Sequence, residues 1–214
     1  MSGSAGILAL WNDCAAERRR EYEHWYQTEH LYERLGITGF LRGRRYASPA
    51  GSPQFFTYYE TTAAQVLQSA EYLQRVEQPS ELTRRVMSGV LTNMSRTACD
   101  VLYRDGRLRG AHACTFKLSA PPDARQWQAI RAALNDLTGL ARCELWGAAR
   151  LASRAATTEE KLRGGDASIA ACLFVESLRA SDAEAIVDIV GDQWAGAIVE
   201  TGCYQLLCEL EAER

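Results

Sequence analysis

The same order of predicted strands and helices runs through this chain twice. The apolar run AGILALW (5–11) is typical of a buried strand. A helix-forming stretch over 15–35 follows it, with Asp13 placed to cap the helix and Gly36 to end it. Further along the first half, the sequence predicts strands over 39–47, 54–60 and 91–103, a turn over 48–53, and helical segments over 62–70 and 80–88.

The pattern restarts at residue 111. Pro121 and Pro122 open a predicted helix that runs to about Leu137, because proline is tolerated in the first turn of a helix. Ser181 begins the capping-box signature S-D-A-E, which predicts the start of another helix. In this half the sequence predicts strands over 111–118, 143–152, 169–177 and 201–209, helices over 121–137 and 182–193, and a polar loop or short helix over 157–165.

Each half therefore has the order strand–helix–strand–strand–helix–strand, which is the ferredoxin-like order. Such an antiparallel sheet carries helices on one face only, so its other face needs a partner. The predicted fold class is α+β: two tandem ferredoxin-like (βαββαβ) repeats, residues 1–108 and 109–214, pack sheet on sheet as an intramolecular α/β barrel. Because the fused halves supply this contact themselves, we expect a monomer, or a homodimer formed through exposed strand edges.

The composition narrows the functional class. Of the 214 residues, 47% are hydrophobic and 24% are charged, and the formal net charge of −3 argues against a nucleic-acid partner. No apolar run approaches the roughly 20 residues of a membrane span, and the N-terminus has no basic signal-peptide region, so we expect a cytoplasmic protein with no membrane partner. The seven cysteines are scattered and form no CxxC pair, which predicts reduced thiols and no metal site.

One short segment, EHWYQTEHLYER (23–34), holds two of the three histidines. On a helix, Tyr26 and His30 are neighbours four residues apart, and aromatic and acidic residues surround them. The corresponding stretch of the second half, WQAIRA (127–132), contains no histidine. We therefore expect one working pocket in the first half and a degenerate second half with a structural role.

The residue types in and near this segment favour proton-transfer chemistry. His30 is the candidate general acid and base, because an imidazole both accepts and gives a proton near neutral pH, and Glu29 is placed to orient it. Arg45 and Tyr46 are candidates to stabilise an anionic oxygen. The predicted catalytic residues are His30, Glu29, Tyr46 and Arg45, and the predicted substrate-binding residues are Tyr26, Trp25, Tyr58, Asn93 and Arg96.

Strand alternation limits this set, because successive side chains point to opposite faces of a sheet. Only one of Arg44 and Arg45 can face the pocket, so the other is expected at the surface. The same limit holds for Tyr58 and Tyr59. The helical periodicity does not decide whether the aromatic or the aliphatic side of the first helix faces the sheet, so a plain structural role for His30 stays open.

Structural roles are expected for the remaining histidines and for the cysteines in predicted strands. His24 falls on the opposite side of the helix from His30, and His112 lies early in a strand. Cys99, Cys114 and Cys172 are expected in the core, because no nearby histidine is placed to activate their thiols.

The layout resembles the dimeric α/β-barrel superfamily in a fused, tandem form. The motifs EHWYQTEHLYER, GFLRGRRY, FFTYYE and NMSRTAC also resemble an EthD-like bacterial group within that superfamily. The resemblance covers the first half at the level of motifs and the second half in layout only. It implies a range of chemistries, from isomerases and polyketide cyclases to cofactor-free monooxygenases and haem enzymes, so the fold alone does not select the reaction.

Three functions are therefore expected from different classes. The first is a cofactor-independent isomerase, lyase or cyclase that acts on a small aromatic or carbonyl-bearing metabolite. The second is a haem-binding, dehydratase-like enzyme of the same fold, with His30 or His112 as the axial ligand. The third is a non-enzymatic, EthD-like accessory protein that binds a small molecule.

Overall fold

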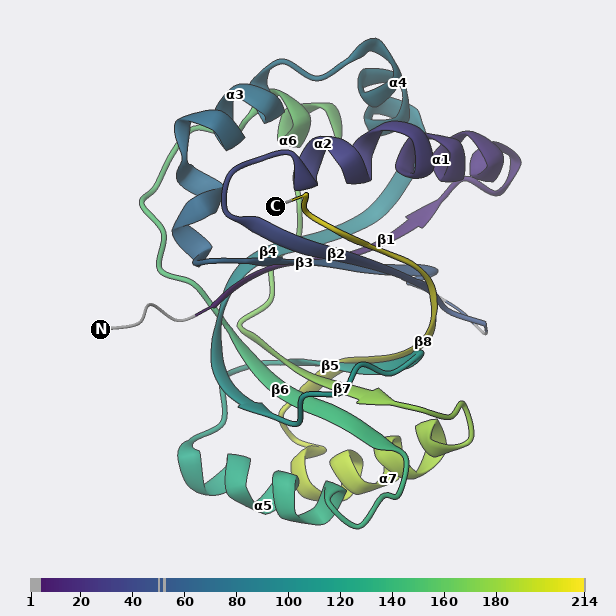
Figure 1. The fold of residues 1–214 in the computed structure, drawn as a ribbon, viewed down its shortest axis with the longest axis vertical. Helices are drawn as coiled ribbons and strands as arrows, with labels where there is room; N and C mark the ends of the chain where they lie inside the picture. The colour runs from purple at the N-terminus through teal and green to yellow at the C-terminus, as the bar shows by residue number, and fades with distance from the viewer. Residues whose placement is uncertain (1–4, 50, 52, 214) are drawn as a thin grey trace.

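Eight antiparallel strands form one closed barrel, with helices on two opposite sides (Figure 1). The computed structural model describes residues 5–49, 51 and 53–213. The order of strands around the barrel is β1-β3-β2-β8-β5-β7-β6-β4. The first-half strands are β1 (Gly6–Cys14), β2 (Phe40–Ala47), β3 (Phe55–Thr61) and β4 (Leu91–Asp105), and the second-half strands are β5 (His112–Leu118), β6 (Leu140–Ala148), β7 (Ala171–Ser177) and β8 (Ile198–Glu211).

The helices lie outside the barrel in two layers, one on each sheet (Figure 1). The layer on β1–β4 is the larger, and it contains the helix that carries His30. Its elements are η1 (Ala16–Arg18), α1 (Arg19–Trp25), η2 (Tyr26–His30), α2 (Leu31–Leu35), η3 (Ala64–Gln68), α3 (Ala70–Glu77) and α4 (Glu81–Gly89), and the layer on β5–β8 contains α5 (Ala124–Leu134) and α7 (Asp182–Trp194).

The two longest strands close the barrel. β4 has 15 residues and pairs with β1 and β6, while β8 has 14 residues and pairs with β2 and β5. The predicted fold class, two ferredoxin-like units packed sheet on sheet, is therefore confirmed. Among the described strands none has an open edge, so the exposed edges expected to support a dimer do not exist in this barrel.

The connection between β6 and β7, residues 149–170, leaves its own half of the molecule. It crosses to the helix layer of the first half, where its helix α6 (Thr158–Leu162) lies beside α3 and α4 (Figure 1). Thr157 starts this helix with a capping box, in which its side chain accepts from the Glu160 backbone N–H and the Glu160 side chain accepts from the Thr157 N–H. We call residues 149–170 the strap.

Several predicted element ends differ from the structure. Asp13 lies inside β1, where its Oδ1 accepts a hydrogen bond from the Gln54 N–H at 2.6 Å, so it does not cap the following helix. Ser181 makes no side-chain capping bond to α7, contrary to its capping-box signature. The predicted strand over 143–152 is 140–148, because the chain turns away into the strap.

Other ends follow from local chemistry that the sequence carries. Asp123 and Gln126 form a capping box that begins α5 after the two prolines, and the helix ends at Leu134, three residues earlier than predicted. The turn predicted over 48–53 is closed by a hydrogen bond from the Ser48 N–H to the Gln54 carbonyl at 2.8 Å. Within that turn, positions 50 and 52 lie outside the described residues. In the described part of the chain, no helix is long and apolar enough to cross a membrane.

Candidate functional site

The helix that carries His30 contains a five-residue π-helical segment, Tyr26–His30, between α1 and α2. Such wider turns occur frequently at functional sites, and they change the register of the helix face. Here the aromatic side is buried: Trp25, Tyr26 and His30 are each at most 3% exposed. Leu31 and Leu35 of the aliphatic side are buried in the same core, so neither face points to solvent alone, and the single predicted helix over 15–35 is interrupted.

His30 lies under the helix among aromatic rings. Its imidazole packs on the Trp25 indole with ring centroids 4.1 Å apart and meets the edge of Tyr26 at 5.2 Å. Its Nδ1 is buried and has no hydrogen-bond partner. Burial lowers the pKa of His30 well below its ordinary value, and the positive charges of Arg34 and Arg163 lower it further. The imidazole is therefore neutral at physiological pH, with an unpaired nitrogen.

A buried ion pair lies beside His30. The Arg34 Nη2 atom is 2.5 Å from Oε1 of Glu159 and 2.6 Å from its Oε2, and both side chains are almost fully buried. Glu159 belongs to the strap, so the second half of the chain supplies this carboxylate. Arg163, also from the strap, lies 3.7 Å from Glu159 and pairs with Asp166 at 2.7 Å.

Arg45 is buried in the same layer and has no carboxylate partner among the described residues. Its guanidinium carbon lies 4.8 Å from the ring centroid of Tyr22, 4.5 Å from that of Tyr26 and 4.9 Å from that of Phe55. Its Nε and Nη2 atoms have no hydrogen-bond partner. An unpaired buried charge is costly to a fold, so the aromatic faces compensate it only in part.

The expectation that one of the two adjacent arginines lies at the surface is wrong. Arg44 is 2% exposed and Arg45 is 1% exposed. They point to opposite faces of β2, Arg45 to the helix layer and Arg44 to the barrel interior, where it pairs with Glu176. A closed barrel with an external helix layer buries both faces of this strand, and the polar interior accommodates the second charge.

Tyr59 is another unpartnered group of this layer. It is fully buried on the helix side of β3, and its hydroxyl has no hydrogen-bond partner. Burial raises the pKa of Tyr59 well above its ordinary value, so the phenol stays protonated and able to donate. Most buried polar atoms in proteins are satisfied, so several unpartnered ones in a single layer need an explanation.

The second terminal nitrogen of Arg34, Nη1, also has no hydrogen-bond partner. The unpartnered groups of His30, Arg34 and Tyr59 surround a small cavity, which we call the chamber. Its volume is about 20 Å³, which corresponds to about one water molecule. The lining also includes Trp25, Tyr26, Tyr72, Met87, Arg96, Glu159 and Arg163.

A second cavity of about 410 Å³, which we call the vestibule, lies against the strap. Arg96 lines both cavities, where it donates to the Tyr72 hydroxyl and lies 3.7 Å from Glu160. The remaining lining of the vestibule is mostly small or apolar, from Leu67, Gln68, Ala98, Leu151, Ala152, Ser153, Arg154 and Ala156. Arg96 therefore stands between a closed inner space and an open outer one.

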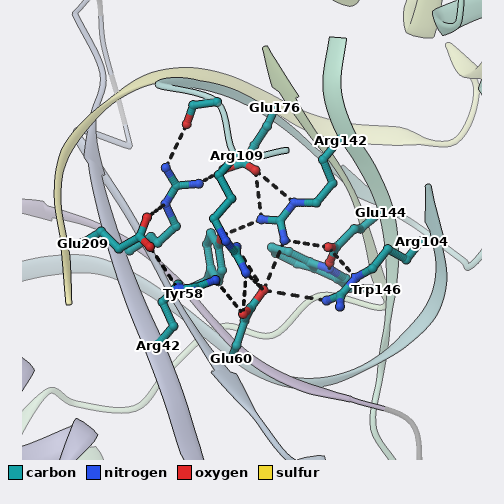
Figure 2. Close-up of polar contacts among 12 residues, drawn as sticks. Arg42, Tyr58, Glu60, Arg104, Arg109, Arg142, Glu144, Trp146, Glu176 and Glu209 are labelled. Atoms are coloured by element: carbon teal, nitrogen blue, oxygen red, sulfur yellow. Dashed lines mark hydrogen bonds and ion pairs between the residues drawn. The ribbon is translucent and has the colours of Figure 1, made fainter. Parts of the chain in front are cut away.

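Two predicted site residues lie elsewhere, inside the barrel. The Tyr46 hydroxyl donates to Glu176 at 2.6 Å, and the Tyr58 hydroxyl accepts from Arg142 at 2.6 Å. Figure 2 shows Tyr58 among arginine and glutamate side chains that bridge the two sheets. Tyr46 and Tyr58 thus belong to a buried ionic network and are separated from His30 by the sheet, while Tyr59 takes the position on the chamber.

Glu29 and Asn93 also have other partners. Glu29 accepts from the hydroxyls of Ser80 at 2.5 Å and Thr83 at 2.7 Å, which ties the π-helical segment to the start of α4. It therefore does not orient His30 as predicted. Asn93, near the start of β4, donates to Asp13 at 3.0 Å. Trp25, Tyr26 and Arg96 do line the chamber.

Sequence reasoning missed Arg34, Tyr72, Glu159 and Arg163. The spacing of Arg34 carries a usable signal, because it lies four residues after His30 and so on the same helix face. No local signal points to Glu159 or Arg163, because the strap comes from the other half of the chain. Within the described residues, no group of three or more histidine, cysteine or acidic side chains is arranged to hold a metal ion.

The corresponding layer of the second half has a different character. It is filled by an apolar cluster that includes Phe116, Trp127, Ile130 and Leu173. His112 is half-buried at the start of β5, opposite Ser177 and Gln205 in the ladder.

Comparison with known proteins shows the fold and does not assign a family. No protein-family model matches the chain, and no curated protein matches it. Solved structures do match over nearly the whole length. An anthrone oxidase-like protein is 11% identical with a TM-score of 0.63, covering 99% of this chain and 94% of its own.

Two further similar structures carry different names. A candidate monooxygenase from Fusobacterium nucleatum is 11% identical with a TM-score of 0.57, and the match covers 100% of both chains. A haem-binding protein from Thermus thermophilus is 11% identical with a TM-score of 0.56, covering 96% of this chain and 92% of its own. At such identities the likeness establishes a shared barrel fold, while the resemblance to an EthD-like group stays a prediction.

Proposed function

We propose that the chamber binds a small aromatic or carbonyl-bearing substrate and that His30 removes a proton from it without a cofactor. The observation that carries this proposal is the set of buried, unpartnered groups around the chamber: a neutral imidazole with a free Nδ1, and the donors of Arg34 and Tyr59. Donors with no acceptor in the protein suit a ligand that brings oxygen acceptors of its own.

The charges of the layer favour a substrate that becomes an anion. Arg34, Arg96 and Arg163 all contribute to the lowered pKa of His30. An enolate or phenolate bound beside them would offset their field and so raise the pKa of the imidazole. The negative charge that develops as the proton leaves would in this way make the imidazole a stronger base along the reaction, and the same arginines would stabilise the anion that is formed.

Entry of the substrate requires movement of Arg96. The chamber holds about one water molecule, whereas a cavity for a benzene-sized ring needs about 150 Å³. The vestibule is large enough for such a molecule, at about 410 Å³, and it is separated from the chamber by Arg96 and its contacts with Tyr72 and Glu160. We therefore infer that the body of the substrate occupies the vestibule and that its acidic end reaches His30 once Arg96 swings aside.

Haem binding is the second candidate, because similar structures include a haem-binding protein and a candidate chlorite dismutase. His30, with its free Nδ1, has the chemistry of an axial ligand. The residues around it do not fit the group, however, since the chamber has a volume of only about 20 Å³ and the buried ion pair of Arg34 and Glu159 forms part of its wall. In the second half, the layer beside His112 is filled by apolar side chains. Haem therefore has no part in the proposed reaction.

Solvent deuterium exchange tests proton removal directly, whatever reaction follows it. Anthrone and a simple aryl ketone, each with a C–H group that the carbonyl acidifies, are incubated with the protein in D₂O, and loss of the C–H signal above the protein-free rate is followed by NMR. We expect enzyme-dependent exchange of at least one probe, lost on His30→Gln and retained in His24→Gln, which alters an exposed histidine of the same helix. Exchange that survives His30→Gln would overturn the proposal.

Three parallel measurements separate the alternatives. Titration with haemin, followed by visible absorption, detects a Soret band that is lost on His30→Ala or His112→Ala if the haem class is correct. Binding of the probes with a His30-dependent affinity but no exchange would favour the accessory, non-enzymatic function. Oxygen uptake that accompanies exchange would assign the reaction to oxidation, in keeping with the names of the anthrone oxidase-like protein and the candidate monooxygenase.

A further inference from the structure

Two cysteines of the second half lie directly opposite each other on neighbouring strands. Cys114 of β5 and Cys203 of β8 are partners in the antiparallel ladder. Their Sγ atoms are 2.9 Å apart, although the residues are separated by 89 positions in the chain. The side chains face the helix layer below, where the Cys114 sulfur lies 4.0 Å from the Ala183 carbonyl at the start of α7.

The backbone of this pair is compatible with a covalent bond. Opposite residues in an antiparallel ladder have Cα atoms roughly 4.5–5.5 Å apart. Disulfides in proteins span Cα separations of about 4.4–6.8 Å, so no strand has to move for the bond to form.

The two thiols differ in accessibility and acidity. Cys203 is half-buried, whereas Cys114 is 2% exposed. The contact with Cys114 lowers the pKa of Cys203, while the same contact and burial raise the pKa of Cys114. Because either sulfur can donate in this contact, accessibility distinguishes the two: Cys203 is placed to meet an oxidant first, and Cys114 is placed to resolve it.

We propose that Cys114 and Cys203 form an oxidisable dithiol site that closes to a disulfide between β5 and β8. Hydrogen peroxide is the oxidant. The Cys203 thiolate attacks one peroxide oxygen, the O–O bond breaks, and hydroxide leaves as water after it takes up a proton, which gives a sulfenic acid. The Cys114 sulfur then attacks the Cys203 sulfur, the S–S bond forms, and the sulfenic oxygen leaves as a second water with the Cys114 proton.

The test counts thiols before and after oxidation. The protein is treated with one equivalent of hydrogen peroxide, unfolded, alkylated with N-ethylmaleimide and weighed intact. The untreated chain should take seven labels and the oxidised chain five, with all seven restored by a reductant. Tryptic mapping should find Cys114 and Cys203 in one linked peptide. Seven labels after oxidation, a link between other cysteines, or a stable sulfenic acid would overturn the proposal.

Matched variants complete the experiment. Cys203→Ser should abolish the linked species, whereas Cys208→Ser, which alters another half-buried cysteine of β8, should retain it. Because the link closes a loop of about ninety residues, the oxidised chain should melt higher than the reduced chain, on the order of 5 °C, with no such rise in Cys203→Ser. A linked form without that rise would contradict the view that the bond locks β5 to β8.

Discussion

Arg34 and Glu159 form a buried ion pair across 125 positions of the chain, with Nη2 of the arginine 2.5 Å from Oε1 of the glutamate. One residue comes from α2 of the first half, and the other comes from α6 in the strap. Their side chains are 3% and 6% exposed. The chamber is thus assembled from both halves, although its histidine and its aromatic residues all come from the first.

Replacing Glu159 with glutamine should destabilise the protein strongly. Removing one partner of a buried ion pair leaves the other charge uncompensated, and this costs about 3–5 kcal/mol. In Glu159→Gln, only the more distant carboxylates of the layer would remain to compensate the charge of Arg34. The free energy of unfolding, measured by urea denaturation, should fall by about 3 kcal/mol.

An exposed ion pair of the same helix layer provides the control. Arg19 and Glu23 lie 3.1 Å apart at the surface, with side chains 50% and 35% exposed. Glu23→Gln should change the free energy of unfolding by less than about 1 kcal/mol, because water screens the pair. If Glu159→Gln and Glu23→Gln lowered the free energy of unfolding equally, the ion pair between Arg34 and the strap would not be important for stability.

Removing the hydroxyl of Tyr59 should not cost stability. This hydroxyl is buried without a partner, and such a group carries an unrepaid desolvation penalty of about 1–3 kcal/mol. Tyr59→Phe should therefore unfold at an equal or higher urea concentration. If the Tyr59 hydroxyl donates a hydrogen bond to the substrate, Tyr59→Phe should also lose deuterium exchange of the probe.

The adjacent tyrosine should behave in the opposite way. The Tyr58 hydroxyl accepts a hydrogen bond from Arg142 inside the barrel. Tyr58→Phe should lower the free energy of unfolding by about 1.5–3 kcal/mol, typical for a bond to a charged group, and leave exchange of the probe unchanged. If Tyr58→Phe abolished exchange while Tyr59→Phe did not, the chamber would be on the wrong side of the sheet.

The buried histidine should make stability sensitive to mild acid. The folded pKa of His30 is lowered, whereas in the unfolded chain it is about 6.5. As the pH falls below that value, the unfolded state takes up a proton that the folded state refuses, so stability present above about pH 6.5 is lost on acidification. The slope from this one group is at most about 1.4 kcal/mol per pH unit.

His30→Gln should remove this part of the pH dependence. Urea denaturation of the wild type and the variant, compared at pH 7.5 and pH 5.5, should show a smaller decrease for the variant. His24→Gln serves as the control, because His24 is exposed and so should not share the effect of burial. If His30→Gln lost as much stability as the wild type between pH 7.5 and pH 5.5, groups other than His30 would control the pH dependence in this range.

Glu176 should be essential for the barrel but not for the chamber. It accepts from Tyr46 and Arg142 and pairs with Arg44, and it is fully buried. Glu176→Gln would leave two buried guanidinium groups short of a carboxylate, so the free energy of unfolding should fall by about 3–5 kcal/mol. Where Glu176→Gln is still folded, it should catalyse exchange of the probe like the wild type. Loss of exchange in the folded variant would show that the ionic network of the barrel is coupled to the chamber.

The fold was predictable because its signals are local. Apolar runs, turn residues and the double strand–helix order identify the two ferredoxin-like units, and the strand predicted over 91–103 is β4, which runs two residues further. The need of each sheet for a cover on its open face predicts that the two sheets pack together. In the structure, pairing of β4 with β6 helps to close them into one barrel.

The site was only partly predictable, for two physical reasons. Alternation shows that Tyr58 and Tyr59 face opposite sides of β3, but a strand buried on both faces gives no sign of which side holds a cavity. The strap is the second reason. The polar run over 157–165 looks like a surface loop, and nothing near Glu159 in the sequence indicates that Arg34 is its partner.

The strap also sets an order of events during synthesis. A growing chain emerges N-terminal half first, and that half already carries Arg34, His30 and Tyr59. The carboxylate that neutralises Arg34 follows only with residue 159. A ribosome-bound or truncated first half therefore cannot contain the finished chamber, and the two repeats, although each has a complete ferredoxin-like order, do not amount to two independent proteins joined end to end.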